Sequence, residues 1–316
     1  MSKDVVLSSA RKGFSGEEVL NAWREQRVAL PLIEKVRAWR TRFSWDASAV
    51  DAVAREVPQA RFVYEGREIV EAALAAVLAG EHLLFVGPKA TGKNVLAEDL
   101  SVAFGRPDWN VSFHIQTDAE ALLGADTFSH GAVVFRPGPV VEAAEAGGFL
   151  ILDEINMARN EALAVLHSLL DDRRMVDVPG HGRVRLNPAA RVIATMNHGY
   201  AGTRELNEAL ASRFVVLHLP MLSEKGVIEL LGKTCPELSN AMQERFGKLF
   251  AALAEKHAQG EISSRAVDLR GLLAAVRLMN LGISPWQAVD MGIVGKCVEE
   301  DEREVVQDVV RMYVEE

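Results

Sequence analysis

Cysteine is scarce in this sequence of 316 residues, which contains only Cys235 and Cys297. The two thiols lie far apart, in segments whose pattern is helical. The sequence therefore holds no disulfide framework and no CxxC metal-binding pair. This scarcity excludes a fold held together by disulfide bonds, and we expect the chain to fold in a reducing compartment.

Long apolar runs are also missing. No stretch approaches the about eighteen continuous apolar residues that a membrane-spanning helix requires. The first ten residues have no apolar core of the kind found in secretion signals. We therefore expect a soluble, cytoplasmic protein without a membrane span.

An excess of positive charge is missing as well. Lys and Arg number 35 against 44 Asp and Glu, so the formal net charge is −9 at pH 7. Proteins whose main partner is bulk nucleic acid carry the opposite balance, although a local basic patch is compatible with an acidic chain. The composition disfavours nucleic acid and favours protein or small-molecule partners.

The histidines supply no recognisable catalytic or metal-binding pattern. None of the 8 histidines shows a ligand spacing such as HxxxH with a carboxylate partner. No Ser-His-Asp or Cys-His arrangement can be argued either. Each lone histidine is interpreted as structural.

Apolar residues, by contrast, make up 49% of the chain, enough for a large core and for about two domains. The pattern divides the chain into three parts: a helical N-terminal extension over residues 1–60, an α/β domain over residues 61–220 and a smaller helical domain over residues 221–316. No internal repeat or long linker is evident.

The N-terminal extension interleaves Trp23, Trp39 and Trp45 with arginines. We interpret it as amphipathic helices that pack on their own chain. The alternative is that the tryptophans present a surface to a partner, because an indole combines a large apolar body with a polar N–H group.

The α/β domain begins with a helix at Arg67–Ala79, for which Gly80 is a plausible C-cap. Apolar segments then alternate with helical or irregular connections, which is typical of a parallel sheet built from crossover units. The predicted strands are Leu83–Val86, Asn110–Ile115, Gly148–Leu152, Arg191–Met196 and Phe214–Leu219.

Two segments interrupt this regularity. Residues Thr127–Gly138 alternate like a β-hairpin with its turn near His130–Gly131, between helical stretches at Ala119–Leu123 and Val140–Ala146. Asp177–Leu186 is a second hairpin candidate. Its Pro, Gly and His residues would equally suit an ordinary solvent-facing loop.

A glycine-framed loop with the sequence GPKATGKN lies between the predicted strand Leu83–Val86 and the helical pattern that starts at Val95. Backbone N–H groups and the positive end of a helix dipole converge at such a junction, and Lys93 adds a cation for the outer phosphates of a nucleotide. Usually Ser or Thr follows the lysine and its hydroxyl binds magnesium, but here Asn94 takes that place. The residues predicted to bind the nucleotide are Gly87, Pro88, Lys89, Ala90, Thr91, Gly92, Lys93, Asn94 and Val95.

Two adjacent carboxylates, Asp153 and Glu154, end a later apolar strand. Asp153 is predicted to bind magnesium, with Asn94 as a second ligand, while Glu154 faces the γ-phosphate and polarises water. Asn197 follows the strand Arg191–Met196, where its amide could hold the attacking water. The alternative for Asn197 is a residue that simply starts a turn.

Taken together, these motifs resemble those of the AAA+ ATPases, and the resemblance is closest to the MoxR branch. It rests on GGFLILDEINMARNEALAVLHSLLDDRR, which begins at Gly147, and on VIATMNHGYAGTRELNEALASRF, which begins at Val192. It covers roughly residues 62–275. The implied fold is an α/β P-loop NTPase core with a five-stranded parallel sheet and a C-terminal helical lid domain. The helical N-terminal extension lies outside the resemblance.

The resemblance also implies roles for single residues. Lys93 would be the Walker A lysine, Asp153 and Glu154 the Walker B pair, and Asn197 the first sensor. Arg213 falls where the family places an arginine finger that reaches the neighbouring subunit's nucleotide. Arg265 is similar to the second sensor on the lid, with Arg270 as the alternative.

Several cofactors and partners follow from the resemblance. ATP and Mg²⁺ would be the cofactors, and a finger acting on a neighbour implies a ring, which we expect to be a homo-hexamer. The two hairpins would lie on the face or pore that acts on other proteins. A von Willebrand A domain protein would be the adaptor, and the client protein is not identified by the sequence.

Two positions depart from the family pattern. Asn94 offers an amide oxygen in place of a hydroxyl, which still permits hard oxygen ligation of magnesium. Ala90 stands where the branch most often has Gly, and a positive φ there would cost about 1 kcal/mol. Slow hydrolysis is one expected consequence.

Three functions are consistent with the sequence. The first is an ATP-hydrolysing ring that remodels or activates a client protein. The second is a nucleotide-gated assembly switch with weak hydrolysis, and the third is the ATPase motor of a metal chelatase. A motor that works on nucleic acid is disfavoured by the acidic balance.

Overall fold

The computed structural model describes residues 13–45, 55–129, 131–197 and 205–314. They form two compact units. The first contains the described residues up to Val86, then Gly92–Met196, and the chain up to His218. The second contains the chain from Leu219 onward together with the short segment Gly87–Thr91 and Asn197.

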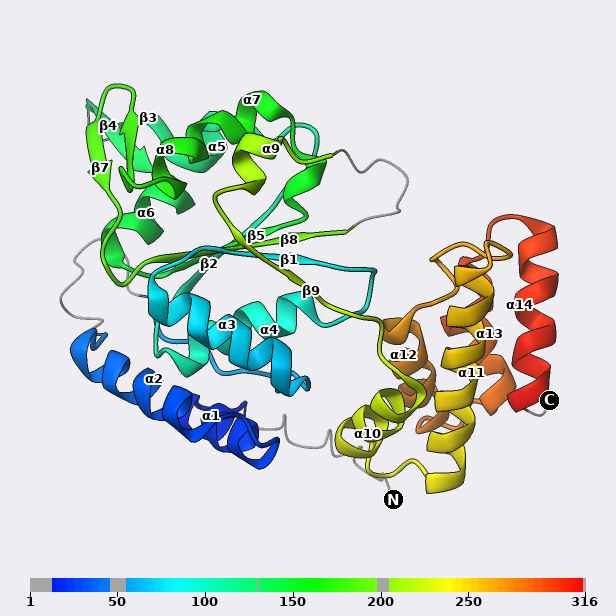
Figure 1. The fold of residues 1–316 in the computed structure, drawn as a ribbon. Helices are drawn as coiled ribbons and strands as arrows, with labels where there is room; N and C mark the ends of the chain where they lie inside the picture. Colours follow the sequence, from blue (N-terminus) through cyan, green and yellow to red (C-terminus); the bar gives the residue numbers. More distant parts are fainter. Residues whose placement is uncertain (1–12, 46–54, 130, 198–204, 315–316) are drawn as a thin grey trace, which may run out of the picture. The chain divides into compact units, whose positions relative to one another are not determined.

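The first unit is built on a five-stranded sheet in which every neighbouring pair is parallel (Figure 1). The order across the sheet is β2-β5-β8-β1-β9. The α/β fold with a five-stranded parallel sheet is thereby confirmed. The strands are β1 Leu83–Val86, β2 Asp108–Ser112, β5 Phe149–Asp153, β8 Arg191–Met196 and β9 Val215–His218.

One predicted strand is displaced. The sequence places a strand at Asn110–Ile115, whereas β2 ends at Ser112. After the strand, the Phe113 N–H donates to the Asp153 carbonyl, and the chain then turns, with the Thr117 N–H bonded to the His114 carbonyl. The predicted strand therefore extends beyond the carboxyl end of β2.

Helices cover both faces of the sheet (Figure 1). On one face lie α3 Arg67–Ala79, which ends at the left-handed Gly80 as predicted, and α4 Lys93–Ala103. The opposite face carries α5 Ala119–Leu123, α6 Pro139–Ala146, α7 Asn160–Leu163, α8 His167–Leu170 and α9 Glu208–Ala211.

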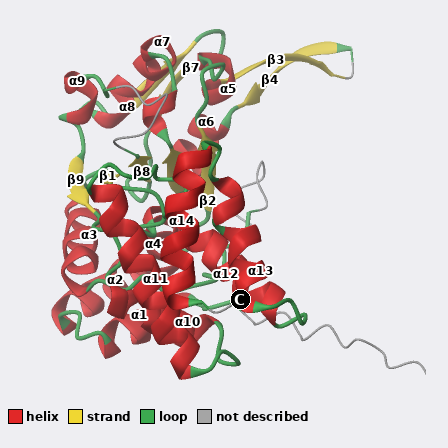
Figure 2. Ribbon diagram, turned by 90° about the vertical axis from the view of Figure 1, so that its right-hand side faces the viewer, coloured by secondary structure: helices red, strands yellow, loops and turns green. Residues whose placement is uncertain are grey.

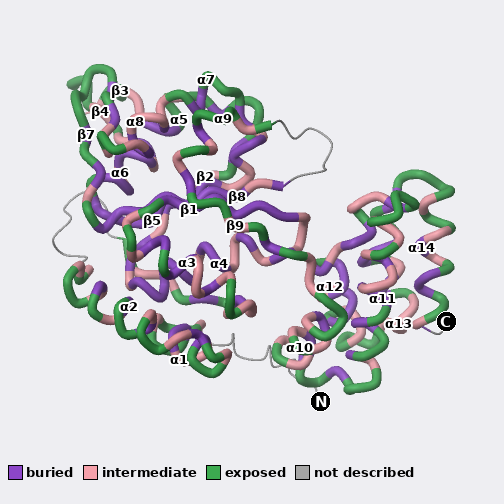
Figure 3. The backbone as a smooth tube through the Cα atoms, viewed as in Figure 1, coloured by how far each residue is buried: buried purple, intermediate pink, exposed green. Residues whose placement is uncertain are grey.

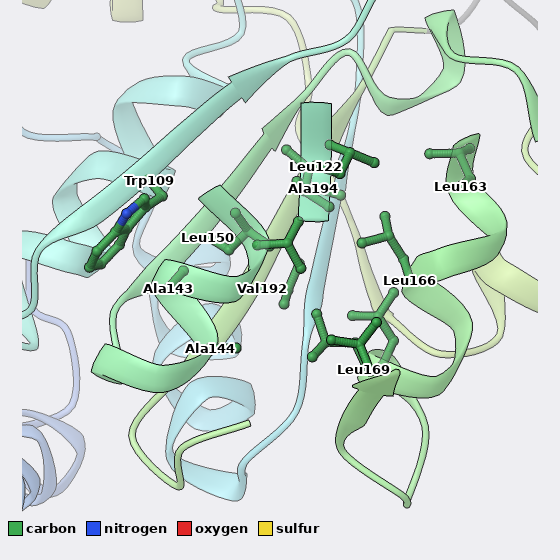
Figure 4. Packing of buried hydrophobic residues seen from close by; sticks show 14 of the residues in the cluster. Trp109, Leu122, Ala143, Ala144, Leu150, Leu163, Leu166, Leu169, Val192 and Ala194 are labelled. Atoms are coloured by element: carbon green, nitrogen blue, oxygen red, sulfur yellow. The ribbon is translucent and has the colours of Figure 1, made fainter. Parts of the chain in front are cut away.

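The apolar core between sheet and helices explains why this part of the chain folds. In β8, every residue before Met196 is buried (Figure 3). Figure 4 shows side chains of the core, among them Leu150, Val192 and Ala194, packed against Leu166 and Leu169. Burial of such aliphatic side chains contributes about 1.5–3 kcal/mol each.

The N-terminal segment forms α1 Gly16–Glu25 and α2 Leu30–Arg42, which contact α4 and α3 respectively. Ser15 and Glu18 form a capping box at the start of α1. Trp23 and Trp39 are buried, so both indoles pack on their own chain. The interpretation of amphipathic helices docked on the main domain is confirmed for these two residues.

Both hairpins are present. The first consists of β3 Gly124–Ser129 and β4 Ala132–Pro137 and projects away from the sheet (Figure 2). The second consists of β6 Met175–Val178 and β7 Gly182–Arg185. The rings of Phe135 and His181 stack with centroids 4.3 Å apart, which joins the two hairpins. His130 of the predicted turn lies outside the described residues.

The second unit is helical from α10 to α14 and has its own apolar core. Gly271 of α12 and Gly292 of α13 let these helices approach closely, because a Cβ at Gly271 would lie 2.1 Å from the Gly292 carbonyl oxygen. None of the helices in the described ranges has the length and apolar character needed to cross a bilayer. The helices are α10 Glu224–Thr234, α11 Asn240–Ala258, α12 Leu269–Met279, α13 Pro285–Gly292 and α14 Glu300–Tyr313.

Candidate active site

The helix that follows the glycine-framed loop begins at Lys93. Its N-cap is Gly92, which adopts the left-handed conformation with φ of 80° and provides no side-chain cap. The first N–H groups of an 11-residue helix therefore point out of its N-terminus without a side-chain acceptor from the cap. Such a terminus attracts an anion through both hydrogen bonds and the helix dipole.

The first half of the loop is closely packed against the chain. A Cβ at Gly87 would lie 2.4 Å from the Leu219 carbonyl oxygen, so only glycine fits. The Thr91 hydroxyl donates to the Pro88 carbonyl at 3.1 Å, which closes the turn. Ala90 has φ of 62°. A positive φ at this non-glycine position was expected to cost about 1 kcal/mol, and Ala90 does adopt a positive φ.

Lys93 is buried, and its charge interacts with those of Asp153, the last residue of β5, and Glu154, the residue after it. Burial lowers the pKa of its ammonium group to about 8, an effect opposed by the negative charges of Asp153 and Glu154. The lysine remains mostly protonated at pH 7. The structure thus brings together the predicted loop lysine and the predicted carboxylate pair, which are distant in sequence.

Asp153 and Glu154 are linked through a residue that the sequence reasoning missed, Thr195. The Thr195 hydroxyl donates to Asp153 Oδ1 at 2.6 Å and accepts from the Glu154 backbone N–H at 3.1 Å. Thr195 comes from β8, the strand paired with β5. The signal in the sequence was a hydroxyl inside an otherwise apolar strand, at a position that faces the carboxyl end of its neighbour.

Glu154 itself has a strained backbone. Its φ of 54° places a non-glycine residue in the left-handed region, which costs about 1–3 kcal/mol. The conformation turns the chain sharply after β5 into the 3₁₀ turn Ile155–Met157. Strain of this kind collects at functional sites, where the surrounding structure imposes it.

Asn197 directly follows β8 and is 8% exposed. The parallel register aligns Val86 of β1 with Met196 of β8, so the residues after both strands leave the sheet at its carboxyl edge. Ligands of open α/β sheets bind at this edge. The loop, the carboxylate pair and the predicted sensor all follow strands that end there.

Arg213 lies just beyond α9 and is partly exposed. Its Nε donates to the His167 carbonyl at 3.2 Å, and an Nη donates to the Ala209 carbonyl. Its charge also contributes to lowering the pKa of His167, after the larger effect of burial. These bonds hold the guanidinium at the surface of the first unit.

Arg265 and Arg270 both lie in the second unit and are exposed. Arg265 occupies the turn before α12, where its N–H donates to the Ser263 hydroxyl. Arg270 is the second residue of α12, and its N–H donates to the Asp268 carboxylate. Either side chain can reach outward from the start of that helix.

The donors available for magnesium are the Asp153 carboxylate and the Asn94 amide oxygen. Magnesium takes few protein oxygens and completes its shell with phosphate and water, so a single carboxylate with one neutral oxygen fits this ion. No cluster of three or more His, Cys, Asp or Glu side chains capable of holding a metal occurs within the described ranges.

Comparison with known proteins agrees with this geometry. The model of the AAA domain family, dynein-related subfamily, matches residues 82–214. The uncharacterized protein YojN of Bacillus subtilis (strain 168) is 34% identical over 256 residues, which are 79% of this chain and 84% of that protein. The uncharacterized protein SH1500 of Staphylococcus haemolyticus (strain JCSC1435) is 31% identical over 80% of this chain and 98% of its own length.

Proposed function

We propose that this chain, which belongs to the AAA+ family of ATPases, binds ATP through the segment Gly87–Val95 and hydrolyses it with Asp153 and Glu154. The observation that carries the proposal is the convergence of Lys93 with both carboxylates at the start of an uncapped helix. A loop lysine and a helix N-terminus that bind phosphates, together with an acidic residue that helps to hold magnesium, are recurring parts of P-loop NTPase sites.

Each residue has a distinct role in this proposal. The N–H groups at the start of α4 and the Lys93 ammonium bind the phosphates, because both present positive charge to one point. Asp153 and Asn94 would hold magnesium, which would neutralise charge that develops on the phosphates. Glu154 accepts a proton from the attacking water, and Asn197 orients that water.

The three arginines are assigned by family resemblance. Arg213 would reach the nucleotide of a neighbouring subunit, and this role is supported by its place on the surface of the first unit. Arginine fingers are worth about three to five decades in rate. Arg265, or Arg270 in its place, would bind the phosphates from the helical unit.

The same proposal includes the branch of the family, the oligomeric state and the protein partners. A MoxR-type ring, with six copies of this chain and a von Willebrand A domain adaptor, would use its hairpins to act on a client protein. The first hairpin supports this role, because Phe128 is 79% exposed and Val133, its cross-strand partner, is 69% exposed. Large apolar side chains in such an exposed pair are typical of protein contact sites.

Steady-state ATP hydrolysis tests the proposal. Glu154→Gln should retain nucleotide binding and lose turnover by at least about two decades, because the amide cannot accept the proton of water. Glu161→Gln is the matched control, since Glu161 is an exposed glutamate on α7. Arg213→Ala should also abolish turnover. Undiminished hydrolysis in both Glu154→Gln and Arg213→Ala would refute the assignment.

A second candidate is a nucleotide-gated switch in which ATP binding alone orders the assembly. It is favoured by the strained Ala90 and by Asn94 at the usual hydroxyl position. The switch predicts tight ATP binding with negligible turnover in the natural chain. Asn94→Thr should then raise hydrolysis by about tenfold or more, because a hydroxyl ligand would be restored. No gain from this substitution would argue against the switch.

A further inference from the structure

The N-terminal helices are tied to the segment that precedes α3. The Trp23 Nε1–H donates to the Tyr64 carbonyl at 3.3 Å, and the Gln26 side-chain amide donates to the same carbonyl at 3.2 Å. The Gly66 N–H returns a bond to Gln26 Oε1 at 3.4 Å. The carboxyl end of α1, with its C-cap residue Gln26, therefore holds the backbone on the carboxyl side of Tyr64 through three hydrogen bonds.

The same tyrosine is fixed from the other side by α4, the helix that starts at Lys93. The Tyr64 N–H donates to Asp99 Oδ2 at 2.6 Å, and Asp99 is fully buried. Helix α1 also lies close to α4, since a Cβ at Gly16 would come within 2.5 Å of the Val102 carbonyl oxygen. Tyr64 is thus held between α1 and α4 by its backbone.

The ring of Tyr64 lies against the last glycine of the phosphate loop. A Cβ at Gly92 would lie 3.0 Å from both Cδ2 and Cε2 of the ring. On its other side, a Cβ at Gly66 would lie 2.9 Å from Cε1. Both glycines have positive φ, and the ring fills the space between them.

Gly92 is the residue that sets the direction of the first turn of α4. Its left-handed φ orients the N–H groups that follow, and the ring leaves this glycine little room to move. Because the interior of a protein is close-packed, a shift of the ring would be transmitted to the loop. The chain of contacts runs from Trp23 and Gln26 through Tyr64 to Gly92.

We propose that α1 sets the affinity of the site for nucleotide, with Trp23 and Gln26 as positioning residues that act through the Tyr64 ring on Gly92. This inference rests on the proposed nucleotide site. It assigns a function to α1 of the N-terminal extension. Tyr64 is the positioning residue in contact with the loop, and the chemical steps remain with Asp153 and Glu154.

The test compares nucleotide binding with turnover at saturation in the full-length chain. Trp23→Phe keeps an aromatic ring but loses the N–H donor, and Gln26→Ala loses the second donor to the same carbonyl. Each should weaken the binding of a fluorescent ATP analogue by about fivefold, and the double variant by about twentyfold. The turnover number at saturating ATP should stay within about twofold of the natural chain.

Two further variants separate positioning from general stability. Tyr64→Phe keeps the ring on Gly92 and should bind nucleotide as the natural chain does, whereas Tyr64→Ala should weaken binding by about tenfold or more. Trp39→Phe is the matched control, because this indole contacts the rings of Phe43 and Phe104 instead. Thermal unfolding of each variant reports its stability separately.

The outcomes are distinguishable. Weaker binding in Trp23→Phe and Tyr64→Ala, with unchanged saturated turnover and unchanged binding in Trp39→Phe and Tyr64→Phe, supports the proposal. Natural affinity in Trp23→Phe, Gln26→Ala and Tyr64→Ala overturns it while leaving the nucleotide site intact. Equal losses in Trp39→Phe and Trp23→Phe also overturn it. A natural chain that binds no ATP refutes the proposed function and this inference together.

Discussion

Charged side chains are buried at both edges of the central sheet, but their roles differ between the two edges. At the carboxyl edge, Lys93 lies near Asp153 and Glu154, and Glu154 has a strained backbone. At the amino edge, Arg191 begins β8 and Arg106 precedes β2, and both guanidinium groups are buried.

The difference lies in what the buried charges bind. The Arg191 guanidinium donates to the carbonyls of Val77, Pro188 and Ala190 at 2.8–2.9 Å. Arg106 likewise donates to the carbonyls of Phe43, Ala146 and Gly147. At the amino edge the buried guanidinium groups thus donate to backbone carbonyls and stabilise the fold. At the carboxyl edge the charge of Lys93 interacts with those of the acidic side chains Asp153 and Glu154.

The largest expected effect at the amino edge is on stability. Arg191→Met removes the donor from three carbonyls, two of which belong to the buried residues Val77 and Ala190, so the free energy of unfolding should fall by about 3 kcal/mol or more. Affinity for ATP should be unchanged in the folded fraction. Chemical denaturation and nucleotide titration measure the two quantities, with Arg185→Met on exposed β7 as control. If Arg191→Met instead lost ATP affinity with no change in unfolding free energy, the amino edge would not have a purely structural role.

At the carboxyl edge, Thr195→Val should lower ATP turnover instead of stability. The substitution keeps the shape of the side chain but removes the bonds to Asp153 and to the Glu154 N–H. A hydrogen bond to a charged group is worth about 1.5–3 kcal/mol, so turnover should fall by about thirtyfold. Thr195→Ser keeps the hydroxyl and should restore most of it. Natural turnover in Thr195→Val would show that Thr195 does not position the carboxylates.

The third expected effect is a pH dependence of stability, which arises from His82 at the amino edge. Burial, assisted by the positive charges of Arg174 and Arg191, lowers the pKa of His82 to about 3. Its Nδ1 accepts from the Val192 N–H at 3.0 Å, which requires the neutral ring. The unfolded chain takes up a proton below about pH 6.5 and the folded chain does not, so stability is lost as pH falls from about 6.5 to about 3.

The size of this loss can be measured by urea denaturation at two pH values. Between pH 7 and pH 5, His82 should account for about 2 kcal/mol of unfolding free energy. His82→Asn keeps an acceptor for the Val192 N–H without titrating, and its stability should depend less on pH by that amount. Identical pH profiles for the two proteins would show that His82 is not the group responsible.

The sequence predicted some elements residue by residue. Strand β8 and helix α3 have the predicted boundaries, because a dense β-branched run and a left-handed Gly80 are local signals. That Lys93, Asp153 and Glu154 lie at the same edge was also predictable, since the carboxyl ends of all strands in one parallel sheet lie at that edge. Local patterns and sheet topology were sufficient for these features.

Other features depend on contacts that no local pattern encodes. Strand β2 ends at Ser112 because its partner β5 ends at Asp153, the residue opposite. Thr195 acquires its role only through the register between β8 and β5. The backbone carbonyl of Tyr64 accepts a hydrogen bond from Trp23, which lies far earlier in the sequence. Distant pairings of this kind are decided by tertiary packing rather than by propensity.

The stack between Phe135 and His181 has a mechanical consequence. A two-stranded ribbon bends easily on its own, because it has no third strand or helix to stiffen it. The ring stack acts as a cross-brace between the β3–β4 ribbon and the β6–β7 ribbon, with a strength of about 0.5–1.5 kcal/mol. Bending of the β3–β4 hairpin away from the β6–β7 hairpin would have to break this contact, so the stack stiffens the projecting hairpin.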